Sequence, residues 1–398
     1  MRIALVADAY APMASSASVL LQDLAQALVA RGHTVTVIVA APHLHKSHDV
    51  EMMGGLEIVR LRTRPTKDLG LLRRLLGEIL LPVDMMRHLL GNPLAKRRYD
   101  GLVWYSPTIF LGPFIAFLKR WSGSSPRAYL ILRDIFPQWA VDLGILKRGL
   151  VHACLTWIER FQYGQADVIG VQSTGNLRHF DGWSHPPEAR LEVLNNWIAI
   201  AQPQPCAIDL STTALQGRSI LVYAGNMGPA QGLDWVMDLA FGMAARTDIG
   251  FVFVGRGSMA AHLRARAAQG GMTHIMFFDE IPPEQIPSLY AQCHIGLVSL
   301  DPRHTTQNVP GKFLSYMQAG LPVLARLNPG NDLEGLIAQN RVGEVVETTD
   351  MHGMQTALDR LLQHMAQDPD TQARCKALAA EVFSVDQACA QIERGLQG

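Results

Sequence analysis

The segment Val309-Pro310-Gly311-Lys312-Phe313-Leu314-Ser315-Tyr316-Met317-Gln318-Ala319-Gly320-Leu321-Pro322-Val323 carries the signals for a loop, a helix and a strand in close succession. A Pro-Gly break comes first. Phe313, Leu314 and Met317 then recur at helical spacing, and Gly320 is a residue type that commonly ends a helix. The apolar residues after Pro322 are typical of a buried strand. We therefore expect a short helix whose N-terminus is presented by a loop.

The N-terminus of this helix is a predicted anion site. The first N–H groups of a helix have no partner inside it, and the helix dipole places about half a positive charge there. Lys312 adds a full positive charge at the same end, next to Gly311. Phosphate is an anion that such a site attracts. An ordinary helix start with a surface lysine is the alternative interpretation.

A second glycine-rich loop lies upstream and also separates a strand from a helix. The strand pattern is Ile220 to Ala224, the loop is Gly225-Asn226-Met227-Gly228-Pro229-Ala230-Gln231-Gly232, and a helical pattern covers 234–245. Glycine lets the backbone approach a ligand closely, and doubly wound nucleotide-binding proteins use this order of strand, loop and helix. Two such loops, one of them basic, predict a diphosphate bound between them.

Three motifs, in this order and spacing, resemble the family 4 retaining glycosyltransferases. They are Gly225-Asn226-Met227-Gly228 with Gly232-Leu233, then Phe251 to Gly257, then Pro310-Gly311-Lys312 with Gly320-Leu321-Pro322-Val323. The likeness covers nearly the whole chain and is greatest to the branch that builds bacterial exopolysaccharides and O-antigens. It implies the GT-B fold, an α/β architecture of two Rossmann-like domains whose parallel sheets face each other across a cleft.

The resemblance also implies domain boundaries. Residues 1–199 are expected to form an acceptor-binding domain, 200–217 a linker, 218–382 a nucleotide-sugar-binding domain, and 383–398 a helix that crosses back to the first domain. Strand and helix patterns alternate in both halves, beginning with a βαβ pattern, and this alternation predicts parallel sheets. A length of 398 residues favours two domains on its own.

Composition and charge narrow the protein class. Hydrophobic residues make up 48% of the chain, which excludes a disordered protein, and the five cysteines include no Cys-x-x-Cys pair, which argues against a zinc site or a disulfide framework. The chain begins directly with a strand pattern and has no secretory signal, so we expect a cytoplasmic location. The uncharged run Gly101 to Leu118 contains Pro107, Gly112 and Pro113, and we expect a strand and a helix there rather than a membrane span.

The two halves of the chain differ in charge. Residues 1–199 contain 22 Lys plus Arg against 16 Asp plus Glu, and residues 200–398 contain 13 against 19. Ten of the cations lie between Arg60 and Arg98, interleaved with leucines in a predicted helix that ends at Pro82. Such a helix can lie in the headgroup plane of an anionic membrane, which would place the protein on the inner face of the plasma membrane. A packed helix with a solvated basic face is the alternative.

Polar residues at strand ends of the first half are candidates for acceptor binding. Ser15 and Ser16 follow the first strand, where the family often has paired glycines; a serine N-cap is the alternative. Arg133 and Asp134 follow the strand 128–132, where doubly wound sheets place ligands. The resemblance implies that this loop reaches the acceptor, with Asp134 orienting or deprotonating its hydroxyl and Arg133 holding an acceptor phosphate. Capping of the strand end is the alternative for both.

The donor site departs from the family pattern. Asn226 and Gln231 occupy positions where most members have an arginine and a lysine, and Gln307 and Ser315 replace two glutamates, the second of which normally holds the ribose. Lys312 is thus left with most of the diphosphate contact. The remaining donor-side candidates are the glycines of both loops, a second cation and a polar pair facing the donor sugar, namely Gly225, Gly228, Gly311, Arg256, Gln307 and Asn308.

These observations predict a retaining, metal-independent glycosyltransferase. Asp-x-Asp occurs once, as Asp368-Pro369-Asp370, outside the motifs of the resemblance. We therefore expect no metal ion, Lys312 is assigned the leaving-group charge, and no cofactor is expected besides the UDP-sugar that serves as donor. The expected acceptor is a polyprenyl-diphosphate-linked saccharide or lipopolysaccharide, and nucleic acid is not expected as a partner. A non-catalytic nucleotide-sugar-binding partner protein and a GT-B-like epimerase are the alternatives. An NAD oxidoreductase is disfavoured because no Gly-x-Gly-x-x-Gly follows the first strand.

Overall fold

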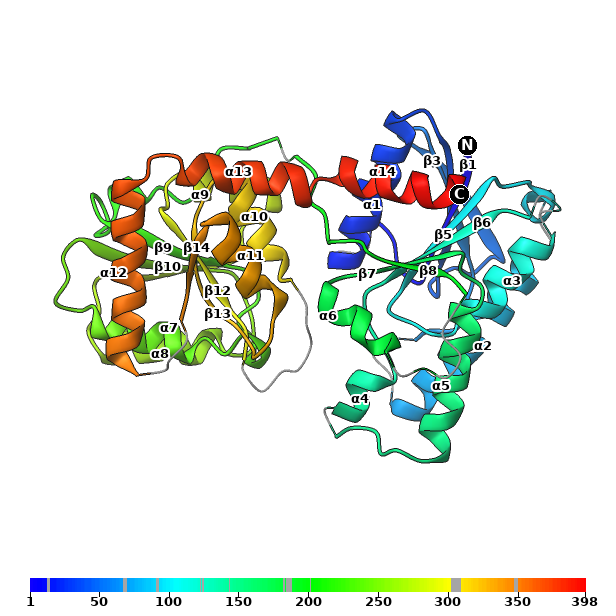
Figure 1. The fold of residues 1–398 in the computed structure, drawn as a ribbon, viewed down its shortest axis with the longest axis horizontal. Coiled ribbons are helices and arrows are strands. Elements are labelled where there is room, and N and C mark those ends of the chain that lie inside the picture. The colour runs from blue at the N-terminus through cyan, green and yellow to red at the C-terminus, as the bar shows by residue number, and fades with distance from the viewer. Residues whose placement is uncertain are drawn as a thin grey trace. The chain divides into compact units, whose positions relative to one another are not determined.

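The structure is a computed structural model that describes residues 1–12, 15–66, 70–90, 93–121, 123, 125–142, 144–181, 183, 188–200, 202–301, 309–346 and 350–398. Its contacts divide the chain into two compact units, which Figure 1 shows as a ribbon. The first unit contains residues 1–197 together with 385–398, and the second contains residues 198–384.

The first unit is built on a sheet that is parallel except at one edge. Within the described residues its strand order is β3-β4-β2-β1-β5-β6-β7-β8, and β3 alone pairs antiparallel, with β4. Central strands such as β1 are buried on both faces, as their unbroken apolar runs predict. The strands are β1 (Arg2–Ala7), β2 (Thr34–Ala40), β3 (His48–Met53), β4 (Leu56–Leu61), β5 (Gly101–Ser106), β6 (Arg127–Leu132), β7 (Val168–Val171) and β8 (Arg190–Val193).

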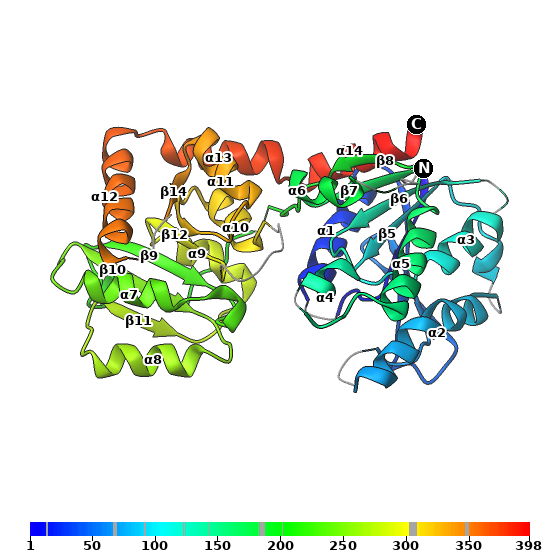
Figure 2. The same cartoon turned by 60° about the horizontal axis from the view of Figure 1, so that its bottom comes forward.

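Helices cover both faces of this sheet, as Figures 1 and 2 show from two directions. Helices α1 and α14 bury their apolar side chains against one face, and α2, α3 and α5 contribute to the core on the other. Among the described residues no helix is long and apolar enough to cross a bilayer. The helices are α1 (Ser16–Ala30), α2 (Leu71–Leu90), α3 (Gly112–Trp121), α4 (Gln138–Asp142), α5 (Leu150–Tyr163), α6 (Thr174–Leu177) and α14 (Val385–Gln397).

The C-terminal helix α14 belongs to the first unit although the second unit precedes it in the chain. Glu393 of α14 accepts from Arg31 at 2.7 Å and contacts His33 at 2.8 Å. Gln391 donates to the carbonyl of Val193 at 2.8 Å. These contacts attach the end of the chain to α1, β2 and β8.

One strand of the first unit was not predicted, and one local prediction was wrong. Residues His48–Met53 form β3, an exposed edge strand whose lack of a buried face removes the alternating pattern that identifies strands. Helix α2 does not end at Pro82 but continues to Leu90. Leu81, Met85 and Leu89 are buried on either side of this proline, and their burial, worth about 1.5–3 kcal/mol for each side chain, offsets the hydrogen bond that proline removes.

The second unit contains a fully parallel sheet in the order β11-β10-β9-β12-β13-β14 within the described residues. The strands expected at Ile220 to Ala224 and after Pro322 are confirmed as β9 and β13. They are β9 (Ser219–Ala224), β10 (Ile249–Val254), β11 (Ile275–Phe278), β12 (Ile295–Ser299), β13 (Val323–Arg326) and β14 (Gly343–Val345). The helices are α7 (Asp234–Gly242), α8 (Ala260–Gln269), α9 (Ile286–Tyr290), α10 (Gly311–Ala319), α11 (Asp332–Asn340), α12 (Met351–Gln367) and α13 (Thr371–Val382).

Most of the segment predicted as linker packs onto the second unit. Ile208, Leu210 and Leu215 are buried in its core. Gln292 donates to the carbonyl of Ile208 at 2.9 Å and accepts from the N–H of Leu210 at 2.8 Å. These few apolar residues lie among prolines and polar residues without helical or strand periodicity, and for this reason the sequence pattern did not reveal their burial.

Candidate active site

The glycine loop after β9 lies where the strand order of the second sheet reverses, because β9 has β10 on one side and β12 on the other. Ligands of doubly wound sheets bind at such a point. The N–H of Gly225 donates to Val254 at 2.8 Å, and that of Met227 donates to the carbonyl of Arg256 at 2.7 Å. A Cβ on Gly255 would lie 2.2 Å from the carbonyl oxygen of Gly225, so the loops after β9 and β10 can run this closely together only with glycine there.

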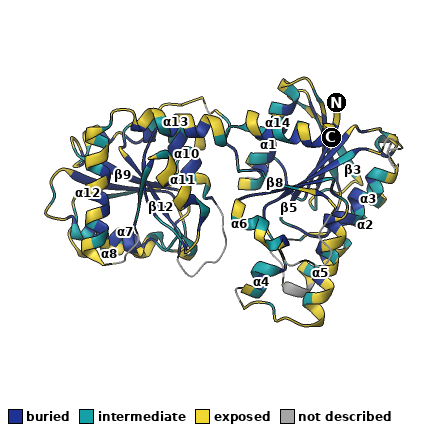
Figure 3. Cartoon of the chain, viewed as in Figure 1, coloured by how far each residue is buried: buried dark blue, intermediate teal, exposed yellow. Residues whose placement is uncertain are grey.

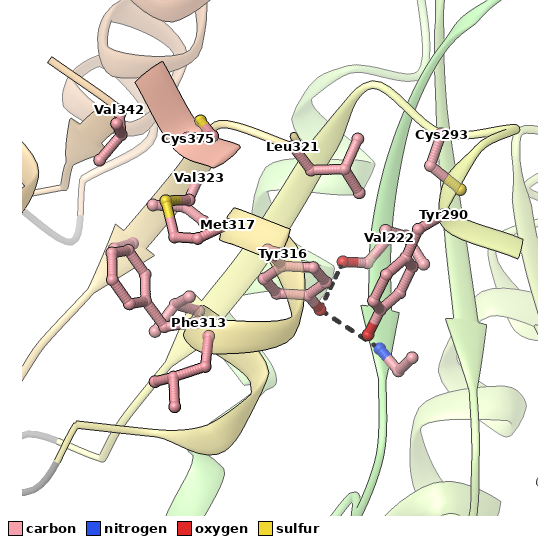
Figure 4. Close-up of a cluster of buried hydrophobic side chains, with 14 of the residues drawn as sticks. Val222, Tyr290, Cys293, Phe313, Tyr316, Met317, Leu321, Val323, Val342 and Cys375 are labelled. Carbon is pink, nitrogen blue, oxygen red and sulfur yellow. Dashed lines mark hydrogen bonds between the residues drawn. The ribbon is translucent and has the colours of Figure 1, made fainter. Parts of the chain in front are cut away.

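Helix α10 is fixed to the end of β9 by Tyr316, a fully buried side chain that Figure 4 shows between the helix and the strand. Its hydroxyl donates to the carbonyl of Val222 at 3.0 Å and accepts from the N–H of Ala224 at 3.4 Å. A Cβ on Gly296 would lie 2.4 Å from the Tyr316 ring, and the glycine in β12 therefore makes room for that ring. The N-terminus of α10 is held beside the glycine loop as a result.

Lys312, in the first turn of α10, points at this loop. Its ammonium lies 4.8 Å from the centroid of the Tyr223 ring, and its Cε would lie 3.0 Å from a Cβ on Gly225. Loss of water around the half-buried side chain lowers the pKa of Lys312 to about 8. Within the described part of the chain its ammonium has no hydrogen bond or ion pair. This is a desolvated cation that an incoming anion would stabilise.

The other polar groups of the glycine loop are neutral and bonded to each other. Asn226 donates to Gln231 at 3.3 Å, and the same Gln231 oxygen accepts from the N–H of Gly228 at 3.0 Å. The two residues that replace the usual cations thus close the loop upon itself. The Tyr223 hydroxyl also donates a hydrogen bond to the carbonyl of Asn226 at 2.6 Å. Positions 226 and 231 therefore supply no second cation beside Lys312.

The remaining donor-side candidates differ in accessibility. Arg256 is 81% exposed and is paired with Glu280 at 3.0 Å. Ser315 uses its hydroxyl to donate to the carbonyl of Gly311, one helical turn earlier, at 3.3 Å. Gln307 and Asn308 lie outside the described residues. Among the residues that are described, no cluster of three or more His, Cys, Asp or Glu side chains has the arrangement of a metal site.

In the first unit, Arg133 is turned into the protein. Only 6% of the residue is exposed, and its guanidinium donates to the carbonyls of Leu194 at 2.6 Å and Asn195 at 3.3 Å. It lies 5.3 Å from the centroid of the Trp197 ring, and desolvation lowers its pKa to about 10. These contacts favour the interpretation of Arg133 as a residue that holds the strand end, over contact with an acceptor phosphate.

Asp134 is oriented differently from its neighbour. The residue keeps solvent contact, yet the protein atoms around its carboxylate raise its pKa by desolvation, Arg133 lowers it, and Asp8 raises it further. The interaction with Asp8 connects the loop after β6 to the loop after β1. A carboxylate that favours its protonated form more than usual suits a group that exchanges a proton with a hydroxyl.

Ser15 lines a cavity of about 230 Å³ in the first unit, at the carboxyl ends of β1 and β5. Ser15 is also the N-cap of α1 and accepts from the N–H of Ser18 at 3.2 Å, while Ser16 is the exposed first residue of the helix. Sequence reasoning missed the cavity's other polar residues because they come from four separate segments. These are Asp8, Thr66, Arg74, Glu78 and Thr108.

The structure thus brings Gly225, Gly228, Lys312 and Tyr223 together in the second unit, and Ser15 and Asp8 together in the first. Two Rossmann-like units, each with polar residues at the point where its strand order reverses, define the GT-B class of glycosyltransferases. Solved structures with this fold match the chain over nearly its full length. Anabaena HepE in complex with UDP has a TM-score of 0.68 at 15% identity over 100% of both chains, and WaaG has a TM-score of 0.62 at 16% identity over 98% and 99%.

The chain belongs to the family 4-like glycosyltransferases. The sequence model described as glycosyl transferases group 1 matches residues 218–364, and that described as glycosyl transferase 4-like domain matches residues 17–197. The putative colanic acid biosynthesis glycosyl transferase WcaI of Escherichia coli is 25% identical over 87% of this chain and 86% of its own. The probable glycosyltransferase WbjE of Pseudomonas aeruginosa is 23% identical over a match that spans 54% of each chain.

Proposed function

We propose that this protein transfers a sugar, with retention of configuration and without a metal ion, from a UDP-sugar to a lipid-linked saccharide or lipopolysaccharide acceptor in bacterial surface polysaccharide synthesis. The observation that carries the proposal is the desolvated ammonium of Lys312 beside the Gly225 loop. The names of WcaI and WbjE and the UDP bound to HepE support the sugar-nucleotide assignment. An N-acetylated or deoxy hexosamine is the proposed donor sugar.

The diphosphate is the part of the donor that this site would recognise. Its charge would meet the Lys312 ammonium and the first N–H groups of α10, and the glycine loop would allow close approach of the backbone. Negative charge on the leaving diphosphate grows as the glycosidic bond breaks, so the ammonium stabilises the transition state more than the ground state. One well-placed donor of this kind contributes about 3 kcal/mol.

The acceptor would occupy the cavity lined by Asp8 and Ser15, whose polar groups suit hydroxyl-rich saccharides. Asp134, with its raised pKa, is the proposed group that orients the acceptor hydroxyl or takes its proton. Arg133 contributes through the backbone carbonyls that it holds.

The basic segment 60–98 would bind an anionic membrane and bring the enzyme to a lipid-linked acceptor. Leu76, Ile79 and Val83 of α2 are exposed, at 55%, 45% and 49%, and Arg73 lies on the same helix. Neutralising Arg73 and Arg74 should reduce sedimentation with anionic vesicles, and added salt should do the same. Unchanged sedimentation of the neutralised variant would contradict this role of α2.

Assay of the purified chain with candidate UDP-sugars and a polyprenyl-diphosphate-linked saccharide or lipopolysaccharide would test the function. UDP release that depends on the acceptor supports a transferase. Tight UDP-sugar binding without turnover for every acceptor would favour a non-catalytic binding protein. Interconversion of the UDP-sugar in the absence of an acceptor would favour an epimerase.

A further inference from the structure

Helix α5 is apolar on two opposite faces. Its inner face contributes Leu155 and Ile158 to a small core with Ile109, Phe110 and Leu75, and Gln162 and Tyr163 are buried at its end. This packing accounts for one apolar stripe of the helix. A helix of a globular protein normally presents polar side chains on the other side.

The outer face of α5 instead exposes large apolar side chains, and Figure 3 shows exposed residues along this helix and the connection before it. Leu150 is 91% exposed, Val151 60%, Trp157 68% and Phe161 38%, and Ile145 in the preceding connection is 69% exposed. The rings of Trp157 and Phe161 stack with centroids 6.2 Å apart. We call these five residues the α5 apolar surface.

Three cations flank the α5 apolar surface, and one exposed acidic residue, Asp142, precedes it in the chain. Lys147, Arg148 and Arg160 are exposed beside it. Glu159 is the single acidic residue between 144 and 164, and it is only 1% exposed and accepts from the Tyr163 hydroxyl at 3.0 Å. The exposed groups therefore combine apolar side chains, an indole and cations, the combination that binds the interface of an anionic bilayer.

We propose that the α5 apolar surface inserts into the headgroup region of an anionic lipid bilayer. Trp157 and Leu150 would enter the boundary of the acyl chains, and Lys147, Arg148 and Arg160 would contact lipid phosphates. A second copy of this chain fits the same surface poorly, because a symmetric pair would place the same cations against each other. The surface shares no residue with the basic segment 60–98, although Leu75 of that segment packs on the inner face of α5. Its binding to lipid does not depend on the proposed transfer reaction.

Cys154 provides a direct probe because it is exposed on α5, one turn before Trp157. In a Cys206→Ser background the other three cysteines are buried, so an environment-sensitive fluorophore can be attached at Cys154. Mixed with vesicles of phosphatidylcholine and phosphatidylglycerol, the labelled full chain should show a blue shift and quenching by lipids that carry a nitroxide near the headgroup. Vesicles of phosphatidylcholine alone should give a much smaller change.

Variants can distinguish insertion of the α5 apolar surface from a general attraction of the whole protein to anionic vesicles. Trp157→Ser with Leu150→Ser should weaken partition into the anionic vesicles by about tenfold through loss of apolar area, and Lys147→Glu with Arg148→Glu should weaken it at low salt. Val50→Ser with Met52→Ser removes exposed apolar side chains from β3 and should leave partition unchanged. The proposal would be overturned if both apolar double variants lost partition equally, or if the probe at Cys154 stayed in water on bound vesicles. Concentration-dependent dimerisation that Trp157→Ser abolishes would also overturn it.

Discussion

Arg133, directly after β6 in the first unit, and Lys312, in the first turn of α10 in the second, both lose water on folding, yet they are bound in opposite ways. Arg133 donates to two backbone carbonyls and lies over Trp197. Lys312 has no hydrogen bond or ion pair in the described part of the chain. Desolvation lowers the pKa of both, to about 10 and about 8.

The difference teaches how to tell a structural cation from a cation that awaits a ligand. Much of the cost of burying Arg133 is offset inside the protein, because both terminal nitrogens of its guanidinium donate to backbone carbonyls, while its buried Nε has no partner among the described residues. The cost of partly burying Lys312 is offset only by the face of the Tyr223 ring among the described groups, since no described hydrogen-bond acceptor or carboxylate contacts its ammonium. Substituting Arg133 should therefore affect folding, and substituting Lys312 should affect binding and catalysis.

The largest expected effect is on catalysis by the Lys312→Ala variant. Turnover should fall by at least about 100-fold, because one charge-stabilising donor contributes roughly 3 kcal/mol to the transition state. Initial rates of UDP release at saturating donor would measure this, with Lys376→Ala, an exposed lysine of α13, as the matched control. Rates within a few-fold of the wild type would show that the diphosphate is held elsewhere.

Arg133→Met should have the next largest effect, and on stability. The variant leaves the carbonyls of Leu194 and Asn195 without their donor, at a cost of about 1–3 kcal/mol for each buried unsatisfied group. Denaturant unfolding should show this loss, while the rate per folded molecule changes only a few-fold. If activity disappears at unchanged stability, Arg133 contacts the substrate and the contrast with Lys312 fails.

Most of the fold could be predicted from the sequence because parallel strands that are buried on both faces appear as unbroken apolar runs. Ile220–Ala224 and Phe251–Val254 are examples, and the helix of Phe313 and Met317 ends at Gly320 as expected, with the glycine at φ 79°. Strand β3 and the far half of α2 were missed. In both cases tertiary context outweighs a local rule. An exposed edge strand shows no alternation of apolar and polar residues, and packing against the core keeps α2 helical beyond Pro82.

The candidate site could be predicted only in part because sequence position does not give side-chain direction. Lys312 and the glycines were identified from loop and helix signals, and these signals depend on neighbours in the chain. Arg133 has the same position relative to its strand as a ligand-binding residue, and only its contacts show that it points inward. Asp8 and Thr108 line one cavity but are 100 positions apart, and no local pattern connects them.

The pH dependence of donor binding should sharpen the assignment of Lys312. The ammonium of the free protein is lost as pH rises through about 8, whereas a bound diphosphate favours the charged form. Affinity for UDP should therefore fall by up to about tenfold for each pH unit above 8, until the higher pKa of the complex is reached. Calorimetric titration with UDP at pH 7, 8 and 9 would measure this.

Lys312→Arg is the matched control for the pH series, since arginine stays protonated throughout this range. Its UDP affinity, whatever its value at pH 7, should be nearly independent of pH. The apo wild type should also gain stability as pH rises from 8 towards 10.5, because the unfolded chain binds the lysine proton more tightly than the folded one does. A wild-type affinity that is flat across pH 8 would contradict the assignment.

The smallest expected effect comes from giving the glycine loop a cation. Asn226 is exposed and bonds to Gln231, so Asn226→Arg should place a guanidinium at the rim without disturbing the core. An exposed ion pair contributes about 0.2–1 kcal/mol, and UDP should bind up to about fivefold more tightly at low salt, with the gain lost at high salt. Asn226→Gln, which adds length but no charge, should show no gain. If Asn226→Arg and Asn226→Gln bind UDP equally well at low salt, the glycine loop lies too far from the diphosphate to bind it together with Lys312.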